Sequence, residues 1–168
     1  MHEVVMRFGA KHAPKFVGKI LDVGSRNING TIRDVLPVTL GIDYVSGPCV
    51  DQVLDATKLI ETFGADSWDN VISNDALEHM QDWDGCLTNM WGVLKPGGMF
   101  LITMANPKKG YHGYPHDYWR ISLADFCRIF GKNPIIDSFE YGPTMGVVVR
   151  KDHPLDMTIR PYPVKGRR

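Results

Sequence analysis

The first half of the chain alternates between apolar runs that end in an acid or an amide and segments of helical character. The apolar runs lie at 20–23, 38–43, 50–55 and 68–74, and the helical segments at 2–13, 31–36, 58–63 and 83–94. Each apolar run has the length of a buried strand. Alternation of this kind predicts an α/β fold, in which a mostly parallel sheet is covered by helices on both faces.

The second half predicts the rest of this sheet and a long loop. Residues 99–105 form a continuous apolar run, as in a central strand, after a Lys-Pro-Gly-Gly breaker. A loop over 106–121 and a helix over 123–130 follow, and 135–141 with 146–150 predict an antiparallel hairpin. We therefore expect one domain over 1–151 and an irregular C-terminal tail over 152–168.

Composition restricts the class of partner. The chain has 168 residues, with 19 basic and 19 acidic side chains, so its formal net charge is zero. This balance disfavours nucleic acid and an anionic membrane as partners. No apolar stretch reaches the roughly 18 residues of a membrane span, and no signal-peptide core is present, so a cytoplasmic protein is expected. Three separated cysteines form no metal-ligand pair, and no metal site is expected; the oligomeric state is left open.

Ligands of open α/β sheets bind beyond the carboxyl ends of the strands, where the strand order reverses. Asp43 lies nineteen residues after Gly24, a spacing at which a carboxylate accepts hydrogen bonds from both ribose hydroxyls. Tyr44 would lie against an adenine ring. Asp55 would accept from the adenine amine, and the amide of Ala56 would donate to a ring nitrogen. Alternatively, Asp43 could only cap a turn and bind no ligand.

The loop after the first strand reads DVGSRNING, with glycines at 24 and 30. The G-x-G-x-x-G pattern that shapes a loop around a dinucleotide pyrophosphate is absent. This spacing disfavours an NAD-dependent oxidoreductase, although that reading stays open as an alternative.

Five segments together resemble the class I S-adenosylmethionine-dependent methyltransferases. They are DVGSRNING, GIDYVSG, VLDAT, WDNVISNDALEHM and VLKPGGMFLIT, in the order and approximate spacing of that family over residues 20–105. The resemblance implies a Rossmann-like three-layer sandwich with a C-terminal antiparallel hairpin strand, and S-adenosylmethionine as cofactor. A sulfonium cofactor has no pyrophosphate, so the missing third glycine agrees with it. Relative to the family pattern D-x-G-x-G-x-G, the loop contains two extra residues and carries Arg26 and Asn27.

The resemblance also implies roles for individual residues. Asp43 would hold the ribose, and Asp55 with Ala56 the adenine. Asn74 would offer its carbonyl near the amino group of the cofactor. The methionine part would be framed by Asp22, Gly24, Ser25 and Gly30.

The loop over 106–121 is the expected acceptor site, because long aromatic loops in compact domains are usually functional. His116 and then His112 are the candidates for a general base, with Asp117 orienting a histidine. Substrate contacts are predicted for Tyr111, Tyr114, Trp119 and Arg120. Asp117, Trp119 and Arg120 could instead only fasten the loop, and His79 is expected to be a wall of the cofactor pocket.

The loop sequence also resembles a branch of small methyltransferases linked to glycan or cell-envelope modification. We therefore expect methyl transfer to an oxygen or nitrogen of a small molecule or sugar. The chain lacks the proline-proline-aromatic signature of DNA amino-methylating enzymes after 68–74, which disfavours a nucleic acid acceptor. A cofactor-binding partner subunit without activity of its own is the alternative from another class.

Overall fold

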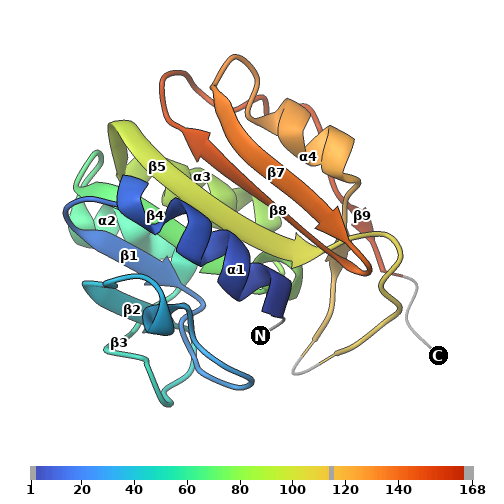
Figure 1. The fold of residues 1–168 in the computed structure, drawn as a ribbon, viewed down its shortest axis with the longest axis horizontal. Helices are drawn as coiled ribbons and strands as arrows, with labels where there is room; N and C mark the ends of the chain where they lie inside the picture. The colour runs from blue at the N-terminus through green and yellow to red at the C-terminus, as the bar shows by residue number, and fades with distance from the viewer. Residues whose placement is uncertain (1–2, 114–115, 165–168) are drawn as a thin grey trace.

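The computed structural model describes residues 3–113 and 116–164, and its centre is a seven-stranded sheet (Figure 1). The strands are β1 (Ile20–Val23), β2 (Leu40–Asp43), β3 (Gln52–Val53), β4 (Trp68–Asn74), β5 (Leu94–Ala105), β7 (Ile135–Tyr141) and β8 (Thr144–Arg150). Their order across the sheet is β3-β2-β1-β4-β5-β8-β7. The first five run parallel, and β8 and β7 pair antiparallel to their neighbours. The predicted α/β class, mostly parallel sheet and C-terminal hairpin are confirmed.

Helices cover both faces of the sheet. The α-helices are α1 (Glu3–His12), α2 (Leu59–Phe63), α3 (Trp83–Val93) and α4 (Leu123–Ile129), and the 3-10 turns are η1 (Ala13–Lys15), η2 (Ile32–Asp34), η3 (Ala56–Lys58) and η4 (Leu77–His79). Figure 1 shows α1 crossing one face and α3 lying behind the other. Fully buried Trp83 and Phe126 belong to the core on the α3 and α4 side, while Phe8 of α1 packs with Ile72 on the opposite side. These are the three layers of the sandwich.

Several elements differ in extent from the sequence prediction. The run at 50–55 contains only a two-residue strand, and the helix expected at 31–36 is a single 3-10 turn. Strand β5 begins at Leu94, before the Lys-Pro-Gly-Gly segment, because Leu94 already pairs with Trp68. The ladder shifts register next to this pair, which accommodates the glycines.

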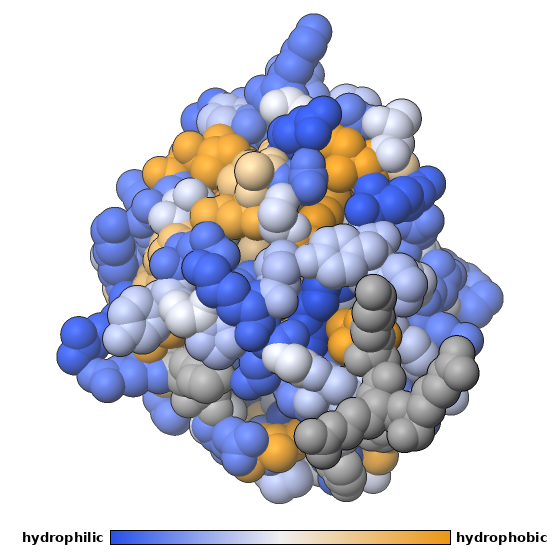
Figure 2. All heavy atoms as spheres, turned by 90° about the vertical axis from the view of Figure 1, so that its right-hand side faces the viewer, coloured by the Kyte–Doolittle hydropathy of each residue, from blue (hydrophilic) through white to orange (hydrophobic). Residues whose placement is uncertain are grey.

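The C-terminal segment packs on the domain although most of it lacks regular structure. Leu155, Met157 and Ile159 pack against the core, and β9 (Tyr162–Pro163) pairs antiparallel with β6 (Trp119–Arg120) inside the predicted long loop. The face that includes this region is mostly hydrophilic, and its apolar residues gather in the upper half of the view (Figure 2). Among the helices of the described residues, none combines the length and apolarity needed to cross a membrane.

Candidate active site

A cleft of about 1190 Å³ opens at the carboxyl edge of the parallel strands. It lies across the ends of β1 and β4, the neighbouring strands at which the strand order reverses. All nine residues predicted to bind the cofactor line this cleft. They are Asp22, Gly24, Ser25, Gly30, Asp43, Tyr44, Asp55, Ala56 and Asn74.

The turn after β1 is built by contacts with two other strand ends. Gly24 has a φ of +82°, and a Cβ there would lie 2.3 Å from the Cβ of Ala76, beyond β4. The amides of Gly24 and Ser25 both donate to the carbonyl of Ile42 in β2, each at 2.9 Å. Glycine is required at this position because the backbone is left-handed and no room exists for a side chain.

The two loop residues Arg26 and Asn27 contact the end of β2 and the segment that follows it. The Arg26 amide lies 3.3 Å from Oδ2 of Asp43, and the Asn27 amide donates to the carbonyl of Pro48 at 2.9 Å. The Arg26 side chain lies against Gly47, where an added Cβ would be 2.8 Å from Nε. The extra loop length therefore closes one wall of the cleft.

The acids at the ends of β2 and β3 also hold their local turns. Oδ1 of Asp43 accepts from the amide of Val45 at 3.1 Å. Oδ1 of Asp55 accepts from the amide and the hydroxyl of Thr57 at 2.9 and 2.8 Å. A carboxylate has about four acceptor sites, so each acid can cap its turn and still accept from a ligand.

Two buried polar groups line the cleft where β1 and β4 end. Burial raises the pKa of Asp22 from 3.8 to about 7, with Arg33 opposing this shift and Asp43 adding to it. Within the described part of the chain, Nδ2 of Asn74 is buried without a hydrogen-bond partner. A polar ligand with an acceptor for the amide and a cation for the carboxylate would satisfy both groups.

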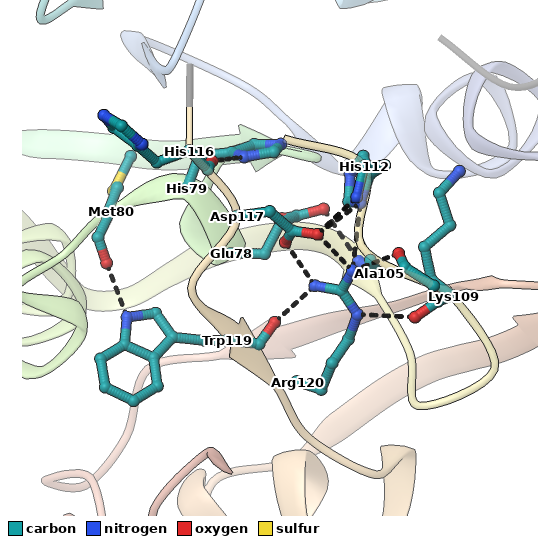
Figure 3. Close-up of polar contacts among 11 residues, drawn as sticks. Glu78, His79, Met80, Ala105, Lys109, His112, His116, Asp117, Trp119 and Arg120 are labelled. Carbon is teal, nitrogen blue, oxygen red and sulfur yellow. Dashed lines mark hydrogen bonds and ion pairs between the residues drawn. The ribbon is translucent and has the colours of Figure 1, made fainter. Parts of the chain in front are cut away.

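The loop between β5 and β6 is held by a buried ion pair. Arg120 donates to Oδ1 and Oδ2 of Asp117 at 2.6 and 2.7 Å, and further to the carbonyls of Lys109, Gly110 and Trp119 (Figure 3). Both side chains are almost fully buried, at 3% and 0% exposure. The guanidinium donors are directed at groups of this chain, which favours the fastening role that the sequence left open.

Asp117 also contacts His112. Oδ2 of Asp117 lies 2.9 Å from Nδ1 of His112 and accepts from the His112 amide at 2.9 Å. Burial lowers the pKa of His112, and although Asp117 opposes this shift, His79 and Arg120 add to it. Burial would raise the pKa of Asp117, but the hydrogen bonds from Arg120 and His112 hold it below its ordinary value. The pair is therefore a neutral imidazole beside an ionised carboxylate near pH 7.

His116, the first candidate for the base, lies elsewhere in this loop. It lines the cleft, but it is exposed, and its ring points away from Asp117 and His112 (Figure 3). Its backbone carbonyl accepts a hydrogen bond from Nδ1 of His79. The rings of His79 and His112 meet edge to face with centroids 5.0 Å apart.

Glu78 is the residue of this site that the sequence analysis did not assign. Its side chain is buried, and Oε1 accepts from the amide of Ala105 at 3.0 Å. Burial raises the pKa of Glu78 to about 8, and the charge of Asp75 adds to this shift. The sequence shows an acid next to His79 after β4, which could have marked Glu78 as a site residue. The burial of Glu78, however, depends on β5 and β6, which are distant in sequence.

The other residues predicted from this loop, where the structure describes them, lie outside the cleft lining. Asp117 and Arg120 stand behind the cleft wall, and the Trp119 indole donates to the carbonyl of Met80 at 2.9 Å. Tyr111 is exposed and does not line the cleft, and Tyr114 lies outside the described residues. From the same region Lys109 and Tyr118, which were not predicted, do line it.

Comparison with known proteins agrees with this geometry. Residues 39–102 match the methyltransferase domain family. A comparison with curated proteins gives no match. The fold is similar to that of 1,6-didemethyltoxoflavin-N1-methyltransferase of Burkholderia thailandensis, solved with 1,6-didemethyltoxoflavin and S-adenosylhomocysteine. The TM-score is 0.66 at 16% identity, over 90% of this chain and 80% of that one.

Two archaeal structures are similar to the same extent. A SAM-dependent methyltransferase of Archaeoglobus fulgidus gives a TM-score of 0.64 at 15% identity, over 89% of this chain and 94% of that one. A Haloferax volcanii complex that contains the Trm112 methyltransferase activator gives 0.63 at 16% identity, over 89% of both chains. Part of the chain thus matches a methyltransferase domain family, and its fold is that of S-adenosylmethionine-dependent methyltransferases of known structure.

Proposed function

We propose that the chain binds S-adenosylmethionine in the cleft at the ends of β1 and β4 and transfers its methyl group to a small molecule or sugar. The acceptor atom is an oxygen or a nitrogen. The observation that carries this proposal is that all nine residues expected to hold the cofactor line one cleft. They come from four different strand ends, so only the tertiary fold brings them together.

The polar groups of the cleft suit the parts of this cofactor. Asp22 would accept from the amino group of the methionine moiety, and Nδ2 of Asn74 supplies a donor at the same end. Asp43 would accept from the ribose hydroxyls. Asp55 and the amide of Ala56 would bind the adenine edge, with the exposed ring of Tyr44 against its face.

The contacts of the first loop argue against a dinucleotide. In a pyrophosphate-binding loop the backbone amides point at phosphate oxygens. Here the amides of Gly24 and Ser25 are both bonded to the carbonyl of Ile42. This loop therefore supports a ligand without phosphates over a nicotinamide cofactor.

The cofactor supplies an activated methyl carbon on a sulfonium sulfur. The chain then has to align an acceptor with that carbon, exclude water and accept a proton. His112 lies at the cleft wall with Nδ1 beside Asp117, so its other nitrogen can accept a proton while the carboxylate stabilises the imidazolium. We thus assign the role of base to His112 in place of His116, because Asp117 orients His112.

A binding subunit without activity remains the alternative, and one structurally similar complex contains a methyltransferase activator. The buried charged pair behind His112 favours an enzyme, because a binding module has no need of an oriented imidazole. Tight binding of S-adenosylhomocysteine without methyl transfer to any tested acceptor would favour the subunit.

The cofactor assignment is tested by calorimetric titration of the full chain with S-adenosylhomocysteine and with NADH. We expect saturable binding of S-adenosylhomocysteine alone. Asp43→Asn should weaken it by roughly 10- to 100-fold, since a hydrogen bond to a charged group contributes about 1.5–3 kcal/mol. Glu61→Gln, an exposed change on α2 away from the cleft, is the control and should leave the affinity unchanged. Saturable binding of NADH alone would overturn the proposal.

A further inference from the structure

Three potential metal ligands meet where the loop after β5 crosses the end of β4. Glu78 and His79 belong to η4, and His112 belongs to the loop (Figure 3). One potential ligand atom of each lies within 4.8 Å of those of the other two. Glu78, His79 and His112 all line the cleft.

Both histidines have their Nδ1 nitrogen in contact with a group of this chain. Nδ1 of His79 contacts the carbonyl oxygen of His116, so it carries the proton and leaves Nε2 with a lone pair. Nδ1 of His112 lies 2.9 Å from Asp117 and 3.1 Å from Nη2 of Arg120. In the tautomer that donates to Asp117, Nε2 of His112 is also free to bind a cation. Metal-binding histidines characteristically donate their other nitrogen to a carbonyl or carboxylate.

Glu78 provides a buried carboxyl oxygen that lacks a partner. Oε1 accepts from the Ala105 amide, whereas Oε2 is buried and has no hydrogen-bond partner among the described residues. A buried oxygen of this kind costs free energy unless a donor or a cation reaches it. The nearby carboxylate of Asp75, which accepts from the hydroxyl of Thr103 at 3.0 Å, raises the pKa of Glu78, and a cation bound between them would offset this repulsion.

We propose that Glu78, His79 and His112 bind a divalent transition-metal ion, such as Zn²⁺ or Mn²⁺, at the wall of the cofactor cleft. Two imidazoles and one carboxylate form a catalytic ligand set that leaves coordination positions open. Bond lengths of about 2.0–2.2 Å hold tetrahedral ligand atoms about 3.4 Å apart, so the site closes slightly around the ion. The His112 side chain is 30% exposed, so its ring has room to rotate toward the ion while the loop backbone stays in place.

This site deepens the proposed function, on which it rests, by naming the acceptor class as a hydroxyl compound. The ion would bind the hydroxyl oxygen and lower its pKa, so that the proton leaves to water. An oxygen electron pair then forms the bond to the methyl carbon while the carbon–sulfur bond breaks and its pair stays on sulfur. His112 is then a ligand of the ion and no longer the base. The sequence analysis expected no metal site, because the ligands come from two separate segments.

Metal binding by the full chain, first freed of metal with a chelator, tests this inference without any acceptor. We expect Zn²⁺ to bind with a stoichiometry of one in calorimetry, and Co²⁺ to develop visible absorption bands from nitrogen ligands. His112→Ala and Glu78→Gln should each weaken Zn²⁺ binding by roughly 100-fold or more, because each removes one of three ligands. His153→Gln, an exposed histidine distant from the cleft lining, is the control and should bind like the wild type.

Two results would overturn the metal site. One is no Zn²⁺ binding by the wild type, and the other is equal binding by the wild type and both ligand variants, whose folding is checked by thermal melting. S-adenosylhomocysteine is titrated into the same metal-free samples. If S-adenosylhomocysteine binds and Zn²⁺ does not, the metal site is rejected and the proposed function stays intact. If Zn²⁺ binds and S-adenosylhomocysteine does not, the cofactor assignment is rejected.

Discussion

Gly24 turns the chain out of β1 with a φ of +82°, and a Cβ at this position would lie 2.3 Å from the Cβ of Ala76. A left-handed backbone costs a residue with a side chain about 1–2 kcal/mol. A methyl group forced into packed atoms costs roughly 1–3 kcal/mol more. Both effects act on the turn that brings the ends of β1 and β4 together.

We therefore expect Gly24→Ala to lower the free energy of unfolding by roughly 2–5 kcal/mol, measured by urea denaturation. Gly97→Ala is the matched control, because Gly97 has a φ of +80° and nothing within 4 Å of an added Cβ. Gly97→Ala should lose only the stability that the left-handed backbone costs. Adding Ala76→Gly to Gly24→Ala should restore part of the lost stability, because it removes the contacted methyl group. Equal losses at both glycines would show that the contact with Ala76 contributes nothing.

The loop between β5 and β6 owes its conformation to contacts at both ends. Arg120 of β6 binds the carbonyls of Lys109 and Gly110 across the loop, and the neighbouring Trp119 binds the segment after η4. Strand β9 pairs with β6 from the other side. The loop is therefore a fixed wall of the cleft over the residues that the structure describes.

Removal of Arg120 should release this wall. Arg120→Ala leaves the carboxylate of Asp117 buried without its main partner, which costs about 3–5 kcal/mol of stability. Amide hydrogen exchange at 109–113 should accelerate, and methyl transfer should fall more than affinity for S-adenosylhomocysteine. Arg128→Ala, which breaks an exposed pair with Asp125, should change stability by about 0.5 kcal/mol or less. Unchanged exchange in Arg120→Ala would contradict the fastening role.

At the scale of the whole molecule, strand order creates the cleft. Strands β1 and β4 are neighbours, but the chain leaves them toward opposite edges of the sheet, so their connections diverge. Apolar cores on both faces of the sheet hold these strands in place. Burial at the end of β1 then raises the pKa of Asp22, so the global stability of the molecule depends on a carboxylate that lines the cleft.

This dependence predicts a loss of stability with rising pH. The folded state binds the Asp22 proton more tightly than the unfolded state, so this contribution is present below about pH 4 and lost as the pH passes about 7. The shift from 3.8 to about 7 corresponds to about 4 kcal/mol. In urea denaturation, Asp22→Asn should stabilise the ligand-free chain at pH 8 by up to this amount and have little effect at pH 4.

The same variant should bind S-adenosylmethionine more weakly, because the amide has no charge for the ammonium group. Asp34→Asn, at an exposed acid, controls for the loss of one negative charge and should show neither effect. A pH-independent effect of Asp22→Asn on stability would contradict the assignment.

The sequence by itself determined the order of the elements and the composition of the strand ends. Hydrophobic periodicity, breakers and acids after apolar runs are local signals, and they predicted the sheet and cleft residues such as Asp43 and Asp55. Others, such as Ser25 and Asn74, were predicted from the resemblance to a family. Short elements were less accurate, as at 31–36, because a single turn carries too few residues to show a period.

Only the tertiary structure decided which groups meet across the cleft. In the folded chain Asp117 contacts His112 and not the ring of His116. Glu78 is buried, and Arg120 binds carbonyl groups of the loop. These outcomes depend on where a long loop is tied to β6 and β9, and on burial, which is a property of the packed molecule. The sequence names the ionisable groups, whereas packing sets their distances, and the distances determine their chemistry.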